Sequence, residues 1–279
     1  MAFEKWLWFM LVLLLLAATR MQQYCVHGQQ QVPCLFVFGD SLSDSGNNKK
    51  LATFAKANYP PYAIDSSIGP TGRFTNGRNA IDYITQFLGF ANLIPPFASS
   101  SGFDILKGVN YASGSAGIHN ETGTHLALHN EFGGRKFALN GLGLIGCIPF
   151  EISNNGISGL CVAYQNFAVA FFNNNLRSLV GQLNEDLSDT QFIYVDNVAI
   201  PAQYPLSGFL EFNIACCPVR GDGQCIPNET PCQNRNQYVF YDGFHTTEPV
   251  NLITAISSYN ASNPFYTYPM DINHLVNSG

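Results

Sequence analysis

Charged residues are scarce in this sequence of 279 residues. Asp, Glu, Lys and Arg together make up 11% of it, whereas about a quarter is usual. The 13 Lys and Arg residues form no cluster. Nucleic acids and anionic membrane surfaces are bound through such clusters, so the sequence predicts no nucleic-acid partner and no binding to an anionic membrane surface.

The eight cysteines lack the C-x-x-C spacing that is typical of zinc sites. His125 and His129 are spaced to share a helical face and could hold zinc with Glu121 or Glu131, but the H-E-x-x-H pattern is absent. We therefore expect no metal site. The cysteines are expected to form disulfides, and their pairing stays open.

No apolar run is long enough to cross a bilayer. The longest, residues 6–18, is shorter than the about 20 residues required, so no stable membrane span is expected. Its length and polar flanks predict a secretory signal within residues 1–28, cleaved after Ala18 or nearer Gly28. A secreted chain meets an oxidising compartment, where cysteines pair. Three sequons, at Asn120, Asn228 and Asn260, are expected glycosylation sites.

Short apolar runs alternate with helical spacing after the signal, which predicts an α/β fold with a parallel sheet and helices on both faces. The expected strands are residues 35–38, 109–112, 135–144 and 191–195, and the expected helices are residues 79–88, 161–187 and 248–259. In the long helix, the face expected to be buried contains Tyr164, Phe167, Ala168, Phe171, Leu176, Leu179, Val180 and Leu183. No linker or repeat interrupts the pattern, so residues 29–279 are expected to form a single domain.

Ser41 follows the first expected strand, where parallel sheets gather active residues, and Gly39 is expected to allow the sharp turn. A serine hydroxyl needs a neighbouring imidazole to remove its proton. Among the six histidines, His245 is favoured because Asp242 lies three residues before it and can hold its Nδ1 atom. Asp40 and Asp44 could suggest the paired carboxylates of glycosidases, but we expect them to form hydrogen bonds within the turn.

Six segments occur in an order that is typical of one family. They read FVFGDSLSDSGNN, GPTGRFTNGRNAIDYI, GVNYASGSAGI, RKFALNGLGLIGCIP, CCPVRGDGQC and YVFYDGFHTTE. Together they resemble the plant-type GDSL esterases and lipases of the SGNH hydrolase superfamily, over nearly everything after the signal. The G-x-S-x-G motif of the α/β-hydrolase fold is absent.

The resemblance implies a three-layer α/β/α fold with a flavodoxin-like parallel sheet. It implies a secreted serine ester hydrolase of the cell wall or apoplast, acting on a small-molecule or lipid ester through an acyl-enzyme, without metal or cofactor. Ser41 would be the nucleophile, His245 the base and Asp242 its partner. The oxyanion hole would use the N–H of Ser41 and of a glycine, best matched by Gly114 and alternatively by Gly117.

The third family signature, Gly-x-Asn-Asp, is missing. Relative to the family, the chain is expected to lack one central strand and flanking helices, with a deletion near residues 131–134. Neither Asn110 nor Asn140 lies in a motif that would make it a replacement. Losing one oxyanion donor is expected to slow turnover by about 10²- to 10³-fold without abolishing it.

A second, smaller departure from the family is Thr246, which stands where the family usually has proline. Threonine is expected to cap the last helix instead. The alternative function is that of a non-catalytic secreted glycoprotein, a truncated relative that keeps the triad residues.

Overall fold

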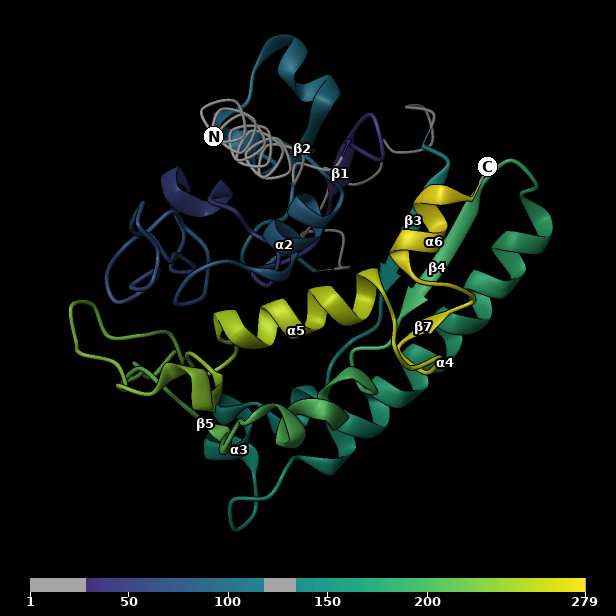
Figure 1. Ribbon diagram of the computed structural model, residues 1–279. Coiled ribbons are helices and arrows are strands. Elements are labelled where there is room, and N and C mark those ends of the chain that lie inside the picture. Colours follow the sequence, from purple (N-terminus) through teal and green to yellow (C-terminus); the bar gives the residue numbers. More distant parts are fainter. Residues whose placement is uncertain (1–28, 118–133, 279) are drawn as a thin grey trace, which may run out of the picture.

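The computed structural model of the protein describes residues 29–117 and 134–278 (Figure 1). The expected signal, Asn120, the zinc alternative at His125 and His129, and nearly all of the expected deletion site lie outside these residues. In chain order the elements, with η for 3₁₀ helices, are β1 (Leu35–Val37), η1 (Asn47–Lys50), α2 (Ala80–Phe87), η2 (Phe97–Ser99), η3 (Gly102–Lys107), β2 (Gly108–Asn110), β3 (Lys136–Asn140), η5 (Ile145–Cys147), α3 (Pro149–Asn155), α4 (Ala163–Asp186), β4 (Gln191–Val195), η6 (Ile200–Ser207), β5 (Glu211–Ala215), η7 (Arg235–Gln237), β6 (Tyr238–Phe240), α5 (Glu248–Tyr259), β7 (Thr267–Tyr268) and α6 (Ile272–Asn277).

Each expected strand and helix is present, and the expected parallel pairing is confirmed. β1 pairs with β2, β3 with β4 and β5 with β6, all in parallel, while β7 joins β4 in the antiparallel direction. These strands form three separate hydrogen-bonded groups. Within the described part of the chain, no strand joins β1 to β3, which is where the sequence predicts that a central strand is lacking.

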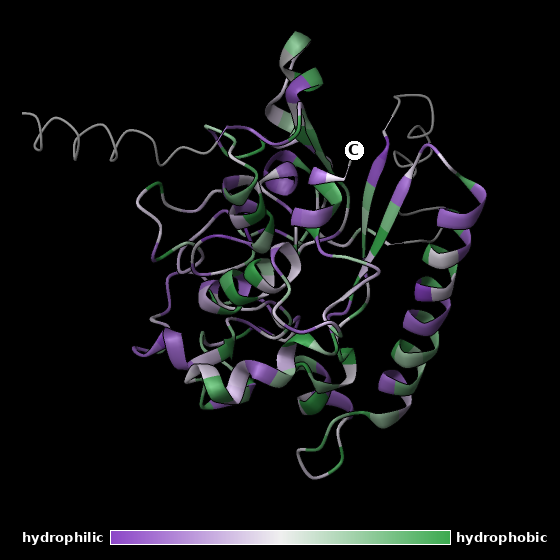
Figure 2. Ribbon diagram, turned by 45° about the vertical axis from the view of Figure 1, so that its right-hand side comes forward, coloured by the Kyte–Doolittle hydropathy of each residue, from purple (hydrophilic) through white to green (hydrophobic). Residues whose placement is uncertain are grey.

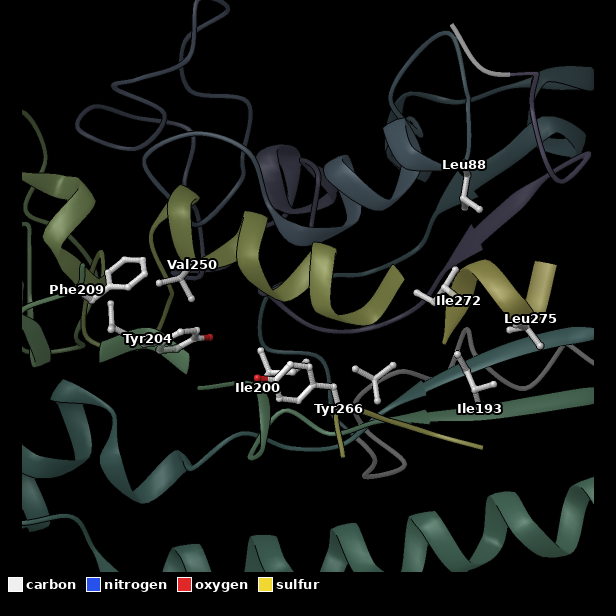
Figure 3. Close-up of a cluster of buried hydrophobic side chains, with 11 residues drawn as sticks. Leu88, Ile193, Ile200, Tyr204, Phe209, Val250, Tyr266, Ile272 and Leu275 are labelled. Carbon is white, nitrogen blue, oxygen red and sulfur yellow. The ribbon is translucent and has the colours of Figure 1, made fainter. Parts of the chain in front are cut away.

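The three-layer arrangement is clearest at β4. Side chains alternate across a strand, so successive residues face opposite layers. Phe192 and Tyr194 pack with Val180 of α4 on one face. Ile193 and Val195 belong to a larger core cluster on the other face, which is lined by α2, α5 and α6 (Figure 3). The strand therefore lies between helices on both sides, as the α/β/α fold class requires.

The buried face of α4 is the predicted one only in part. Val180 is buried as predicted, and Leu176 and Leu183 pack against the same cluster. In the first half of the helix, however, Val169 and Asn173 are buried, whereas Phe167 and Phe171 are 77% and 68% exposed. Asn173 fixes this orientation, because its amide donates to the Leu142 carbonyl and accepts the Leu142 N–H. Figure 2 shows that α4 runs along the outside of the strands, with apolar and polar residues mixed on it. Apolar residue type alone gave the wrong face for the first half of the helix, because a buried amide decides the orientation there.

Disulfides form as expected from secretion. They join Cys147 to Cys161, Cys216 to Cys232 and Cys217 to Cys225, and Cys34 is a free, half-buried thiol. Two of the three bridges lie in the segment 216–232, which leads toward β6 and the loop after it. In the described residues, no helix combines the length and apolar character that crossing a membrane requires.

Candidate active site

Ser41, His245 and Asp242 form one hydrogen-bonded chain. The Ser41 Oγ lies 2.7 Å from the His245 Nε2, and the His245 Nδ1 lies 2.8 Å from both Asp242 oxygens. Ser41 is 204 residues from His245 in sequence. Asp242 is 0% exposed and His245 is 5% exposed. The structure therefore brings together the three residues that the sequence selected as nucleophile, base and orienting carboxylate.

The turn after β6 holds the carboxylate. Asp242 Oδ1 accepts the backbone N–H groups of Phe244 and His245, both at 2.8 Å. These bonds fold the D-x-x-H segment onto itself, so that the carboxylate meets the imidazole three residues later. Because the carboxylate accepts from Nδ1–H, Nε2 carries the free lone pair that faces the serine.

Aromatic rings flank the imidazole and limit its movement. Phe74 lies against the His245 ring at a centroid distance of 4.8 Å, and Phe244 approaches its edge at 5.9 Å. Phe150, at the start of α3, packs on Phe244 at 4.6 Å. A small pocket opens beside the pair, and its lining residues are Ser41, Leu42, Phe74, Thr75, Asn79, His245, Thr246 and Asn251. Apart from Ser41, Leu42, Phe74 and His245, this lining is threonine and asparagine.

Asp44 organises the loop that carries the serine. Its carboxylate accepts the N–H groups of Gly46 and Asn47 at 2.7 Å and that of Gly114 at 3.0 Å. Burial raises the pKa of Asp44, and these N–H groups oppose that rise. Asp40 likewise accepts the N–H of Leu42 at 2.9 Å. The expected role of both aspartates in the turn is confirmed.

The glycine that the turn requires is Gly46, not Gly39. Gly46 has φ 131°, and Gly39 is not among the residues with positive φ. A Cβ on Gly46 would clash with the Thr71 carbonyl oxygen, and one on Gly72 would lie 2.7 Å from the Gly46 Cα. Two backbone segments therefore approach each other here more closely than any side chain would permit.

Three asparagines tie the serine loop to the segment after β2. The Asn47 amide donates to the carbonyls of Asn110 and Ala112, and the Asn48 amide donates to that of Gly114. In return, the Asn110 amide donates to the Ser43 carbonyl at 2.7 Å. These contacts give the polar DSGNN segment a function: its side chains replace the backbone pairing that a longer sheet would provide.

Sequence reasoning missed the segment 71–76, which connects the serine loop to the histidine loop. Arg73 forms a buried, bidentate ion pair with Asp82 and also donates to the Ser45 carbonyl. Thr75 Oγ1 donates to the Thr246 carbonyl at 2.9 Å. Asn76 Oδ1 accepts the Glu248 N–H at 2.8 Å. The sequence feature that could have indicated this segment is the motif GPTGRFTNGRNAIDYI. It is rich in polar side chains, and an isolated turn would not need so many of them.

The capping role expected for Thr246 is wrong. The N-cap of α5 is Thr247, which makes no side-chain cap bond. Thr246 Oγ1 donates to Asn251, and Thr247 Oγ1 donates to the Tyr238 carbonyl. The first N–H of α5 is instead satisfied from outside the helix, by Asn76.

The two glycines considered for the oxyanion hole differ in their contacts. The Gly114 N–H donates to Asp44. No described residue accepts the N–H of Ser41 or that of Gly117. Asn110 is committed to Ser43, and Asn140 is exposed at the end of β3.

Two expected glycosylation sites lie in the described part of the chain. Asn228, in the stapled segment 216–232, and Asn260, at the end of α5, are both exposed. Within the described residues, no group of three or more His, Cys, Asp or Glu side chains is arranged to hold a metal ion.

Comparison with known proteins agrees with the geometry. The family model of GDSL-like lipases and acylhydrolases matches residues 35–131 and 122–256. GDSL esterase/lipase At1g29670 and At1g29660 of Arabidopsis thaliana are each 37% identical to the chain, over 89% and 90% of it and 92% and 93% of their own lengths. The first alignment spans 340 positions although this chain has 279 residues, so that relative contains residues without a counterpart here. The chain therefore belongs to the GDSL lipase/acylhydrolase family, and with it to the carboxylic ester hydrolases.

Proposed function

We propose that the protein is a secreted serine hydrolase that cleaves carboxylic esters through an acyl-enzyme on Ser41. The observation that supports this most is the continuous hydrogen-bonded chain from Ser41 Oγ through His245 to Asp242. His245 and Asp242 are buried, while Ser41 lines the small pocket that a substrate carbonyl would approach. The substrate is a small-molecule or lipid ester.

The reaction follows from the atoms in place. Ser41 Oγ attacks the ester carbonyl while its proton passes to His245 Nε2, and the imidazolium is stabilised by Asp242. The tetrahedral intermediate collapses, and His245 gives that proton to the leaving alcohol oxygen. Water then attacks the acyl-enzyme, with His245 again taking and returning the proton, and the carboxylic acid leaves.

For the oxyanion we infer two backbone donors, Ser41 and Gly117, because no described residue accepts either N–H. Gly114 would first have to leave Asp44. The family's third donor, a side-chain amide, has no replacement that these contacts support. We therefore expect turnover that is measurable and about 10²- to 10³-fold lower than with three donors.

Secretion is part of the proposal. The apolar run of residues 6–18, three sequons and three disulfides all fit a chain that passes through the secretory pathway to the cell wall or apoplast. We also propose that the shortening relative to the family lies near residues 131–134. Two observations support this position: the family model matches in two segments that overlap at residues 122–131, and among the described strands the β1 and β3 groups are not joined.

The test is hydrolysis of a short-chain p-nitrophenyl ester by the purified protein and by Ser41→Ala. The wild type should be faster, and a fluorophosphonate probe should label it but not the variant. Equal rates, with no labelling, would instead favour the non-catalytic secreted glycoprotein. Secretion is tested separately, by the N-terminal sequence of protein recovered from the medium of expressing plant cells. Protein that stays inside the cell and still begins with residues 1–28 would contradict secretion.

A further inference from the structure

We propose that Tyr62 is a positioning residue of the active site, which holds Asp242 in line with His245 and is itself anchored by the Cys217–Cys225 disulfide. The Tyr62 hydroxyl lies 2.6 Å from Asp242 Oδ2. This role rests on the proposed function and extends the triad by one residue.

The direction of this hydrogen bond is fixed by a second contact. The Cys225 backbone N–H donates to the Tyr62 oxygen at 3.2 Å. A backbone N–H only donates, so the tyrosine oxygen accepts there, and its single proton is left for the carboxylate. Burial, followed by the nearby Asp242 charge, raises the pKa of Tyr62 well above its ordinary value of 10, so the hydroxyl keeps that proton.

The hydrogen bond from Tyr62 gives Oδ2 of Asp242 a donor besides the imidazole, as Oδ1 has from the backbone. Oδ1 accepts two backbone N–H groups, from Phe244 and His245. Oδ2 accepts Tyr62 and shares the imidazole Nδ1–H. Without the tyrosine, one oxygen of a fully buried carboxylate would depend on the imidazole alone. The carboxylate would then rotate more freely, and the imidazole with it.

Tyr62 is held by its surroundings from both ends. Its ring is 1% exposed and makes edge contacts with Tyr59, Phe74 and Tyr241 at centroid distances of 5.3, 6.1 and 5.9 Å. Its hydroxyl meets Cys225, which is bonded to Cys217. The same stapled segment touches the turn again, because the Gly243 N–H donates to the Gly223 carbonyl.

Tyr59 provides a matched control. Its ring lies in the same cluster, and its hydroxyl donates to the carbonyl of the same Cys225, at 3.0 Å, without a contact to Asp242. Tyr62→Phe should lower kcat about ten- to a hundred-fold, the size expected for one hydrogen bond to a charged group, with KM changed less than about three-fold. Tyr59→Phe should stay within about two-fold of the wild type.

A double-mutant cycle separates positioning from a structural role. The readout is the second-order rate constant for labelling of Ser41 by a fluorophosphonate, which is measurable for slow variants. When Asp242 is present, Tyr62→Phe should lower this rate about ten-fold or more. In the Asp242→Asn background, it should lower the rate less than about two-fold. Equal losses in both backgrounds, or losses matched by Tyr59→Phe, would overturn the role of Tyr62.

Two outcomes distinguish this proposal from the proposed function. If Ser41→Ala is as active as the wild type, the proposed function fails, and the role of Tyr62 fails with it. If the wild type is active and Tyr62→Phe equals it, only the role of Tyr62 fails. Should Tyr62→Phe not fold, proton NMR of the wild type should show a slowly exchanging tyrosine hydroxyl that is lost in Asp242→Asn. Its persistence in that variant would overturn the proposal.

Discussion

The Asn76 Oδ1 atom accepts the backbone N–H of Glu248 at 2.8 Å, across 172 residues of sequence. This contact satisfies the first N–H of α5, the helix that begins three residues after His245. The side-chain amide of Asn76 also donates to Asp65 at 2.7 Å. One buried asparagine therefore connects the Asp65–Arg235 ion pair to the start of α5.

Replacing this residue, Asn76→Ala, should lower the free energy of unfolding by about 2 kcal/mol, because a helix N–H loses its acceptor in a buried place. Urea denaturation measures the change. Asn175→Ala is the control: that side chain is exposed on α4 and donates only to the Phe171 carbonyl. A stability equal to that of the control would show that Asn76 does not cap α5.

Asp44→Ala should be more severe. Three buried N–H groups, those of Gly46, Asn47 and Gly114, lose their acceptor, and the expected loss is at least about 3 kcal/mol of unfolding free energy. Asp40→Ala removes an exposed carboxylate that accepts a single backbone N–H, that of Leu42, and should cost about 0.5 to 1 kcal/mol. Chemical denaturation of both variants compares them. Similar losses for the two would contradict the organising role of Asp44.

A pH dependence is expected at the Asp65–Arg235 ion pair. The hydrogen bonds from Arg235 hold the pKa of Asp65 below its ordinary 3.8. The folded state thus favours the charged carboxylate, so the stabilisation is present above pH 3.8 and is lost as the pH falls through the lower, folded-state value. Arg235→Gln should lower stability by about 0.5 to 1 kcal/mol at pH 6, since the pair is partly exposed.

The measurement is the Tm of the wild type and of Arg235→Gln at a series of pH values. The difference between them should shrink toward zero as the pH falls below 3.8 and through the lower pKa of the folded state. Arg78→Gln serves as a control, because Arg78 donates to the uncharged Gln86, and its effect should not follow that titration. A Tm difference between the wild type and Arg235→Gln that grows as the pH falls would contradict this prediction.

The orientation of α4 is tested by substitutions on its two faces. Phe167→Lys should change the unfolding free energy by no more than about 0.5 kcal/mol, because the ring is 77% exposed. Val180→Ala should cost about 1 to 3 kcal/mol, since Val180 is 0% exposed and packs on β4. If Phe167→Lys were the more damaging of the two, Phe167 would be buried, as its residue type predicts.

The sequence was sufficient where local chemistry decides the structure. Asn79 and Asp82 form the capping box that starts α2 where a helix was predicted, and Asp242 reaches His245 through a turn of three residues. It was insufficient where distant contacts decide. Asn173 sets the rotation of α4 and Asn76 caps α5, and each acts on a partner that only the folded chain brings near. Tyr62 was missed for the same reason, since its partner lies 180 residues away.

The division of the strands into three hydrogen-bonded groups has a consequence for the heated protein. Ser41 follows β1, whereas Asp242 and His245 follow β6, and these strands belong to different groups. In the described residues, the serine-to-imidazole distance is set by side-chain packing and by loop hydrogen bonds such as those of Arg73 and Thr75, without strand pairing between the two groups. On heating, the groups can therefore slide apart while each keeps its own backbone bonds. Esterase activity should then vanish several degrees before circular dichroism reports melting, and thermal inactivation rather than unfolding would set the working temperature.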